Sequence, residues 1–230
     1  MKAMKKIGLL GGMSWESTVV YYQLLNRIAR DRLGGLHSAD LLLWSFDFAE
    51  IERYQSEGDW EGVTRIMVDA ARSVELGGAE CLLICTNTMH KMAAEVQASV
   101  NIPLIHIADS TAPAIKDAKI TSPLLLATRY TMEQDFYKGY LKEHHNIEVV
   151  TPDDKGRTIV HNIIYEELCR GVVLPASKDR YLEVVERADA DGVIFGCTEV
   201  GLLLSQSDLT VPAFDTTQLH AEAAINYALQ

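Results

Sequence analysis

The chain has 230 residues, of which 48% are hydrophobic and 23% are charged, and this composition is that of an ordinary globular protein rather than a disordered one. The net charge of −11 argues against nucleic acid and against an anionic membrane as the main partner, because both require a basic surface. No apolar run approaches the ~20 residues of a membrane span, and no cleavable leader is recognisable at 1–6, so we expect a cytoplasmic protein with reduced cysteines.

Strands and helices alternate along the first half of the sequence. A strand is predicted at 6–11, and the glycines at its end permit a sharp turn into a helix that lasts to about residue 32. Periodicity and capping residues predict the remaining elements, which are strands at 41–48, 81–84 and 102–107, helices at 59–76 and 89–99, and a helix capped by Asp109-Ser110-Thr111. This alternation predicts an α/β fold with a parallel sheet.

The second half repeats this order. A strand that runs into a turn is predicted at 124–131, and further strands are predicted at 148–151, 190–195 and 211–215. The predicted helices lie at 158–170, at 175–188 and after Thr216-Thr217. The landmarks recur at a spacing of about 110 residues, which indicates internal duplication. We therefore expect two pseudo-symmetric parallel-sheet α/β domains, 1–115 with 208–230 and 116–207, with the active site in the cleft between them.

Two polar stretches follow buried strands in the two halves, Cys85-Thr86-Asn87-Thr88-Met89-His90 and Gly196-Cys197-Thr198-Glu199. Aligning Cys85 with Cys197 is the obvious match, but aligning Thr86 with Cys197 fits the preceding strand better. A shift of one residue turns a strand side chain to the opposite face. The sequence therefore predicts that Thr86 is the counterpart of Cys197, whereas Cys81 and Cys85 share a face and are inert core thiols.

Several cofactor and metal chemistries lack their signatures. Cys81 and Cys85 cannot both reach one zinc ion from a regular strand. The chain has no Cys-x-x-Cys motif for thiol redox chemistry, no G-x-G-x-x-G fingerprint and no Walker lysine. No lysine lies in a recognisable pyridoxal phosphate setting. We expect neither a metal nor a cofactor.

The sequence resembles the cofactor-independent aspartate/glutamate racemase superfamily, and within it the aspartate racemase branch. The resemblance rests on Leu-Leu-Gly-Gly-Met-Ser near the N-terminus, Cys-Thr-Asn-Thr-Met-His at 85–90, Thr-Arg-Tyr-Thr-Met at 128–132 and Gly-Cys-Thr-Glu at 196–199, and it covers essentially the whole chain. The first family motif is Cys-Asn-Thr-x-His, whose cysteine position is occupied here by Thr86. This departure resembles a subgroup of L-aspartate/L-glutamate-specific racemases with one cysteine and one threonine.

The resemblance implies that Cys197 removes the Cα proton of the L substrate and that Thr86 lies on the D face. A threonine hydroxyl is a poor base at neutral pH, so we expect the initial L→D rate to exceed the D→L rate. The α-carboxylate needs preorganised donors, for which the candidates are Asn87, Thr88, Thr198, Thr128, Met89 and the Met13-Ser14 turn. Taken alone, Ser14 and Thr128 are more typical of helix caps. Glu199 is a candidate to bind the ammonium group of the substrate or to tune the thiol of Cys197. As an acidic residue in the first turn of a helix, it could equally serve only to interact favourably with the helix dipole.

A dicarboxylate substrate also needs a cation for its distal acid. Family members use an arginine after the second strand, to which Arg53 is nearest, and a lysine from the second half, where Lys155, Arg157 and His161 lie without a clear match. The resemblance further implies a homodimer. The alternatives are a hydantoin racemase or maleate isomerase relative with another substrate, and an amino-acid-binding protein without catalytic activity.

Overall fold

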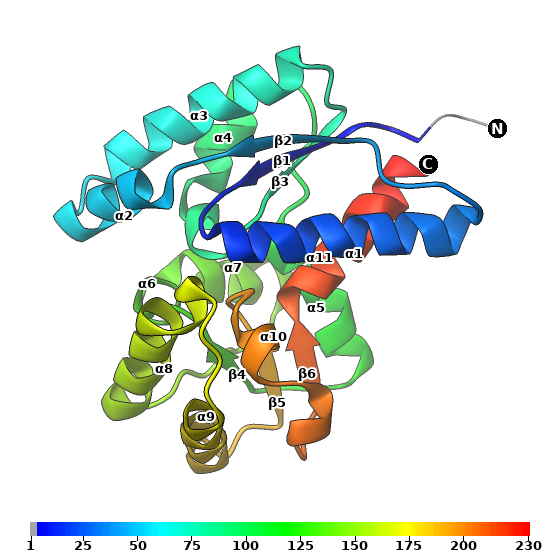
Figure 1. The fold of residues 1–230 in the computed structure, drawn as a ribbon. Helices are drawn as coiled ribbons and strands as arrows, with labels where there is room; N and C mark the ends of the chain where they lie inside the picture. The colour runs from blue at the N-terminus through cyan, green and yellow to red at the C-terminus, as the bar shows by residue number, and fades with distance from the viewer. Residues whose placement is uncertain (1–3) are drawn as a thin grey trace. The chain divides into compact units, whose positions relative to one another are not determined.

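The computed structural model describes residues 4–230, and these form two compact units. One unit comprises the chain up to His106 together with His220–Gln230, and the other comprises Ile107–Leu219. Each unit contains a three-stranded parallel sheet flanked by helices (Figure 1). The predicted α/β class with two parallel sheets is thereby confirmed.

The first sheet has the strand order β2-β1-β3, with β1 at Ile7–Gly11, β2 at Leu41–Ser45 and β3 at Cys81–Ile84. Every residue of β1 and β3 is buried. Helices cover both faces of a parallel sheet, so its central strands are continuous apolar runs rather than alternating ones. β2 is the edge strand, and three of its five residues are exposed.

Two helical layers cover this sheet (Figure 1). α2 at Phe48–Glu57, α3 at Trp60–Leu76, a 3₁₀ helix at Thr88–Met92 and α4 at Ala93–Ser99 pack on the face that carries Leu82 and Ile84. α1 at Trp15–Leu33 and the last turns of α11, which spans Thr216–Ala228, pack on the face that carries Cys81 and Cys85. The side chains of β3 thus alternate between two separate cores, as a period of two residues requires.

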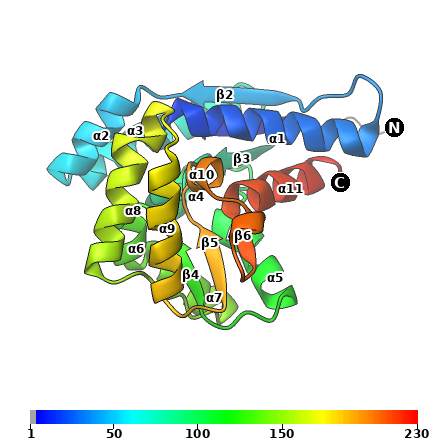
Figure 2. The ribbon, with the colours of Figure 1, turned by 60° about the horizontal axis from the view of Figure 1, so that its bottom comes forward.

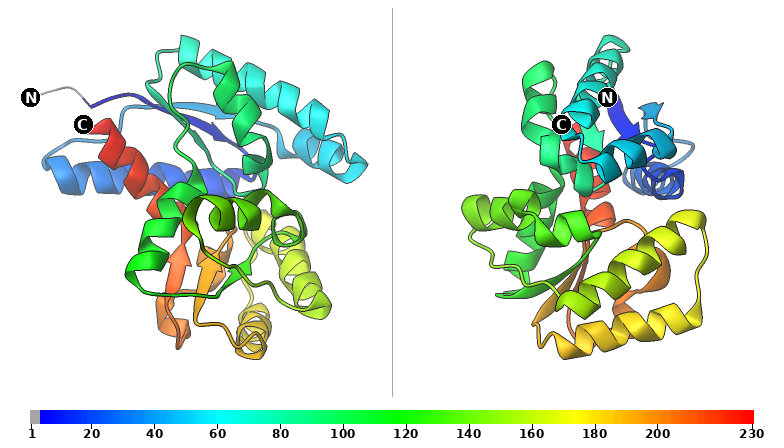
Figure 3. Two further views of the ribbon diagram at one scale, coloured as in Figure 1. Left: turned by 180° about the vertical axis from the view of Figure 1, so that it is seen from behind. Right: turned by 90° about the vertical axis from the view of Figure 1, so that its left-hand side faces the viewer.

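The second sheet has the order β4-β5-β6, with β4 at Pro123–Leu126, β5 at Gly192–Phe195 and β6 at Ala213–Asp215 (Figure 2). Its helices are α5 at Ile107–Asp117, α6 at Arg129–Glu133, α7 at Asp135–His145, α8 at Asp154–Glu166, α9 at Pro175–Arg187 and α10 at Val200–Leu203, with 3₁₀ turns at Leu168–Arg170 and Gln206–Asp208. α8 and α9 lie side by side (Figure 3).

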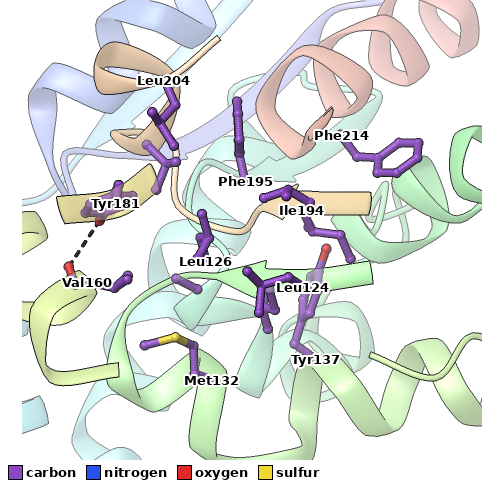
Figure 4. Close-up of a cluster of buried hydrophobic side chains, with 14 of the residues drawn as sticks. Leu124, Leu126, Met132, Tyr137, Val160, Tyr181, Ile194, Phe195, Leu204 and Phe214 are labelled. Carbon is purple, nitrogen blue, oxygen red and sulfur yellow. Dashed lines mark hydrogen bonds between the residues drawn. The ribbon is translucent and has the colours of Figure 1, made fainter. Parts of the chain in front are cut away.

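One continuous apolar core fills the second unit (Figure 4). Tyr181 of α9 is fully buried in it and donates a hydrogen bond from its hydroxyl to the carbonyl of Val160 on α8, at 3.1 Å. Burial raises the pKa of Tyr181 well above its usual value, with smaller contributions from Cys197 and Glu199. A buried hydroxyl needs such a partner, so this bond also fixes α9 against α8.

The hydrogen-bond ladders show the same register in both units. The N–H of Cys85 donates to Leu10 and the N–H of Gly196 donates to Leu126, each at 2.9 Å and each one residue beyond the strand. This makes Gly196 the counterpart of Cys85, and hence Cys197 the counterpart of Thr86. The alignment that the sequence favoured is therefore the one that the backbone adopts.

A fourth, reduced strand position completes the parallel between the units. Leu104 forms a single parallel bridge with Leu82, and Val150 forms one with Leu124. The sequence predicted strands at 102–107 and at 148–151, and both predictions were wrong in extent, because each segment forms one bridge and α5 already begins at Ile107. Asp109 consequently lies within the first turn of α5 rather than at its N-cap.

The boundaries of the two units also differ from those expected. The expected first domain was 1–115 with 208–230 and the expected second was 116–207. In the structure α5 packs against α7 and β6, and β6 pairs with β5, so all these elements belong to the second unit. β6 is therefore part of the second unit, because its hydrogen bonds with β5 place both strands in one sheet.

Gly12 connects β1 to α1 with a left-handed φ of +85°, and a Cβ there would meet the backbone of Phe46. We expect Gly12→Ala to lower the free energy of unfolding by about 2 kcal/mol or more, because backbone strain and a backbone clash act together. Urea denaturation measures this change. The matched control is Gly58→Ala, where φ is +72° and no atom lies within 4 Å of the added Cβ, so about 1 kcal/mol is expected. Equal losses in both variants would contradict the steric account.

Candidate active site

The second unit places Cys197 two residues beyond the end of β5, at the carboxyl edge of its sheet. Cys197 is half-buried, and its Sγ donates a hydrogen bond to Oε2 of Glu199 at 2.8 Å. Gly196 must be small here, because a Cβ would collide with Leu125 of β4. The glycine therefore lets the chain leave β5 closely packed while the next residue carries the thiol.

Glu199 accepts hydrogen bonds from two thiols. Its other oxygen, Oε1, accepts from Sγ of Cys169 at 3.6 Å. Burial raises the pKa of the Cys197 thiol well above its usual value, and the charge of Glu199 and the neighbouring Cys169 raise it further. Cys197 is thus held as a protonated thiol beside a carboxylate that can accept its proton. Of the readings open from the sequence, this contact supports Glu199 tuning Cys197.

The first unit places Thr86 at the equivalent position beyond β3. Thr86 is half-buried, whereas Asn87, Thr88 and Met89 are buried in the turn that follows. Cys85 is buried in the core beneath it, and burial raises the pKa of its thiol strongly. Burial also raises the pKa of Cys81 to about 12. Both thiols are enclosed by apolar side chains in the core of the first unit, so the prediction of two inert core cysteines is consistent with their surroundings.

Ser14 and Thr128 cap helices. The hydroxyl of Ser14 accepts a hydrogen bond from the N–H of Ser17 at 3.3 Å, at the start of α1. The hydroxyl of Thr128 accepts from the N–H of Thr131 at 3.4 Å, at the start of α6. Both follow the first strand of their sheet, and Met13, Ser14 and Thr128 are buried. The cap interpretation of these two residues therefore describes their contacts.

The candidate cations are engaged with other groups. Arg53 on α2 is exposed, forms an ion pair with Glu57 at 3.3 Å and stacks over the ring of Tyr54 at 4.4 Å. In the second unit Arg157 pairs with Glu133 at 3.2 Å and also contacts Asp154.

The two other second-half candidates have different surroundings. Nδ1 of His161 accepts a hydrogen bond from the backbone N–H of Arg129 at 3.3 Å. Burial lowers the pKa of His161, and Arg129 lowers it further. Lys155 lines a cavity of about 510 Å³ together with Arg129 and Thr158. Lys155 is thus the candidate that opens onto a volume able to hold a small anion.

Sequence reasoning assigned no role to four residues that lie beside the candidate groups or beside one another there. Cys169 contacts Glu199, and the histidines His90, His106 and His220 lie together behind Thr86. His90, the last residue of the motif at 85–90, is buried, with Nδ1 at 2.9 Å from the carbonyl oxygen of Thr86. No short sequence motif could have predicted these contacts, because the partners are far apart in the sequence: Cys169 and Glu199 are separated by 30 residues, and His220 and Ile105 by 115.

Within residues 4–230, no group of three or more His, Cys, Asp or Glu side chains is arranged to hold a metal ion. Over the same range, no helix combines the length and the apolar character needed to cross a membrane. All four cysteines are free thiols. The two equivalent turns thus present a thiol that is hydrogen-bonded to a carboxylate in the second unit and a hydroxyl in the first.

Comparison with known proteins gives a consistent result. A family model described as Asp/Glu/hydantoin racemase matches residues 10–224. A crystal structure of a candidate Asp/Glu racemase from Yersinia pestis is 52% identical, covers 99% of this chain and 100% of its own, and superposes with a TM-score of 0.90. An aspartate racemase homologue from Pyrococcus horikoshii is 35% identical over 99% and 100% of the two chains, with a TM-score of 0.85.

A more distant curated relative also spans the full chain. The broad specificity amino-acid racemase RacX of Bacillus subtilis is 18% identical over 96% of both sequences. Aspartate racemase from Picrophilus torridus, at 22% identity and a TM-score of 0.76, shares the fold.

Proposed function

The chain belongs to the Asp/Glu/hydantoin racemase family and is an amino acid racemase, and on that premise we propose that it racemises L-aspartate or L-glutamate without a cofactor. The observation that carries the proposal is the Cys197–Glu199 hydrogen bond of 2.8 Å at the carboxyl edge of the second sheet. Racemisation needs a group that alternates between acid and base at Cα, and a thiol beside a proton-accepting carboxylate meets that need.

In the L→D direction, the thiol proton of Cys197 passes to Glu199. The thiolate then takes the proton from Cα, and the electrons of the broken C–H bond remain on the substrate as a carbanion conjugated with its carboxylate. A proton is delivered to the opposite face of Cα on the side of Thr86, by its hydroxyl or by water that the hydroxyl holds. The cycle closes when Glu199 releases its proton to solvent and the hydroxyl or water on the Thr86 side takes one up, so that no net charge or proton is gained.

The carbanion needs donors that are already oriented before reaction. Asn87, Thr88 and Thr198 are buried polar residues in the turns that follow the two strands, and we assign them to the α-carboxylate. Met13, Ser14, Met89 and Thr128 remain proposed substrate contacts. Ser14 and Thr128 act by holding the starts of α1 and α6, whose positive ends attract a carboxylate.

The distal carboxylate of the substrate requires a cation. We propose Arg53 for this role, because the guanidinium is exposed and its partner Glu57 is an i,i+4 surface pair that costs little to break. Arg53→Ala should raise KM for dicarboxylic amino acids while KM for neutral amino acids is unchanged. If both classes respond alike, Arg53 does not select the substrate, and Lys155 becomes the candidate to test.

Substituting Thr86 by cysteine tests the proposed role of this position. A thiol can ionise near neutral pH and a threonine hydroxyl cannot, so Thr86→Cys should raise the initial D→L rate by about tenfold or more. Chiral chromatography of both directions measures this, and the ratio of enantiomers at equilibrium must stay at one. The control is Thr88→Cys, two residues further along the same turn, which should give no gain. A Thr86→Cys enzyme that is no faster with D substrate would contradict the assignment.

The alternatives predict different products. A hydantoin racemase or maleate isomerase relative would leave free aspartate and glutamate untouched and act on its own substrate. A binding protein without activity would bind an amino acid and form no D enantiomer. Incubation with L-aspartate, L-glutamate and neutral amino acids, followed by chiral analysis, separates these outcomes, and the proposal expects D-aspartate or D-glutamate.

We also propose a homodimer in the cytoplasm. Trp15, Val19 and Tyr22 form an exposed stripe along α1, and Leu43 and Trp44 are exposed on the edge strand β2, which runs alongside α1 (Figure 2). Such an apolar surface beside an open strand edge is typical of contact with a second copy. Light scattering should give twice the mass of 25.5 kDa, and Tyr22→Arg should shift the protein toward the monomer; a monomeric wild type would contradict the proposal.

A further inference from the structure

A cluster of buried aromatic side chains lies at the carboxyl edge of the first sheet. It consists of His90, His106, His220 and Tyr21, all buried. The ring centroid of His90 lies 4.6 Å from that of His106 and 5.8 Å from that of His220. The ring of Tyr21 packs edge-to-face on the ring of His220, with 5.7 Å between their centroids. None of these side chains carries a role in the proposed reaction.

The hydrogen bonds assign the tautomers of two of these rings. A carbonyl oxygen only accepts, so Nδ1 of His90, at 2.9 Å from the Thr86 oxygen, carries a proton and donates. Nε2 of His220 likewise donates to the carbonyl of Ile105 at 2.7 Å, and its Nδ1 accepts from the hydroxyl of Tyr21 at 2.8 Å. Burial beside other imidazoles holds the pKa of both rings below its usual value and so favours the neutral form in which these bonds are written.

The hydrogen bonds of His90 and His220 fix the backbone carbonyls of Thr86 and Ile105 at the carboxyl edge of the first sheet. The ladder of β3 closes with the bond from the N–H of Cys85 to Leu10, so the carbonyl of Thr86 lies just beyond it. Ile105 belongs to the neighbouring segment, which pairs with Leu82 and then turns away. One cluster thus fixes two segments at the sheet edge, and the direction of the Thr86 side chain depends on the first of them.

The second unit lacks this arrangement. The shared register makes Gly201 the counterpart of His90, because both lie four residues after the equivalent positions Cys197 and Thr86. The bonds from Leu82 to Pro103 and from Val193 to Pro212 make Asp215 the counterpart of His106 in the same way. There the carbonyl of Cys197 accepts from the backbone N–H of Val200 at 3.0 Å. The cluster of His90, His106 and His220, called the histidine brace below, therefore belongs to the unit that carries Thr86 and is not repeated at Gly201 and Asp215 of the other unit.

We propose that His90 is a positioning residue for Thr86, supported by the His220–Tyr21 pair, and that it selectively governs proton delivery to the D face. A hydroxyl delivers a proton only at hydrogen-bond distance and in the right direction, so a small rotation of the Thr86 backbone reduces inversion. Cys197 and its contacts with Glu199 lie in the other unit and do not depend on His90. This inference rests on the proposed racemase function.

The test compares two rates in D₂O with the L substrate: formation of the D enantiomer, and incorporation of deuterium into recovered L substrate, which reports abstraction and return at Cys197. His90→Leu removes the donor at similar size, and the ratio of inversion to exchange should fall about tenfold, the worth of one buried hydrogen bond. His90→Asn places an amide N–H near the position of Nδ1 and should restore the ratio to within about threefold. His90→Gln, whose amide lies near the position of Nε2, should not.

A purely structural role would lower both rates together and leave their ratio unchanged, and that result in His90→Leu would overturn the inference, as would equal ratios in His90→Leu and His90→Asn. Should His90→Leu fail to fold, Tyr21→Phe removes only the hydroxyl from the far end of the cluster. It should lower the ratio in the same direction, and no change there would also overturn the inference. A wild type that shows neither exchange nor inversion would instead refute the proposed function.

Discussion

Replacing Cys197 by alanine is expected to abolish turnover in both directions, with a loss of about 10³-fold or more, because the group that removes and returns the Cα proton on the L face is gone. The half-buried thiol is next to the carboxylate of Glu199, at 2.8 Å, whereas the thiol of Cys169, which is also half-buried, lies 3.6 Å from the same carboxylate. Chiral chromatography of L and D substrate measures the loss, and circular dichroism checks that the variant is folded.

The matched control for Cys197→Ala is Cys85→Ala. Both cysteines precede a threonine and follow a buried strand, but Cys85 is buried in the core of the first unit, whereas Cys197 is half-buried and contacts Glu199. Cys85→Ala is expected to cost some stability and to retain racemisation. The reverse pattern, with activity lost in Cys85→Ala and kept in Cys197→Ala, would contradict the register on which the site is built.

Glu199→Gln refines the same prediction. Glutamine can still accept a hydrogen bond from the thiol but cannot take its proton, and burial keeps that thiol protonated. We expect kcat to fall about 10²-fold with little change in substrate affinity. Unchanged turnover would show that the proton of Cys197 leaves by another route.

The first unit is expected to lose stability steeply as the pH falls from 6.5 toward 4. Burial lowers the pKa of His220 to about 4, with His106 lowering it further against the opposing bond to Ile105. Burial, His106 and His220 together hold the pKa of His90 well below its usual value. Because the folded pKa values lie below the unfolded value of about 6.5, the unfolded chain binds protons first. The stabilisation is complete above about pH 6.5 and is lost below it.

The expected size of the loss follows from His220. A depression from 6.5 to about 4 corresponds to a loss on the order of 3 kcal/mol of unfolding free energy at pH 4. Urea denaturation at a series of pH values measures it. His220→Gln keeps a donor near the position of Nε2 but does not titrate, so its stability should fall less over the same interval. Parallel curves for wild type and variant would show that this histidine does not titrate on unfolding.

The succession of strands along the chain and the equivalence of Thr86 and Cys197 could be predicted, because both depend on local sequence patterns. Apolar runs of four to five residues predict buried strands, and the lead-in Leu82–Ile84 matches Val193–Phe195 residue for residue in the ladders. The helix α3 was predicted closely from its apolar periodicity, and Asp59, at which the predicted helix begins, is its N-cap. In each case the deciding interactions lie within a few residues or one strand.

The parts that failed depend on distant partners. The segment 102–107 has the composition of a strand, but its only bridge is at Leu104, because Pro103 has no N–H to donate and α5 begins at Ile107. The boundary between the units follows pairing of β6 with β5, which no local signal reports. His220 reaches Tyr21 across 199 residues, so the histidine brace behind Thr86 could not be seen in the sequence.

The central claim is that Cys197 exchanges the Cα proton of a dicarboxylic amino acid, and proton NMR of L-glutamate or L-aspartate in D₂O tests it most directly. The account predicts that the Cα–H signal disappears with the wild-type protein, that the D enantiomer accumulates with deuterium at Cα, and that both effects vanish in Cys197→Ala. A folded wild-type protein that binds the amino acid while the Cα–H signal persists would contradict it.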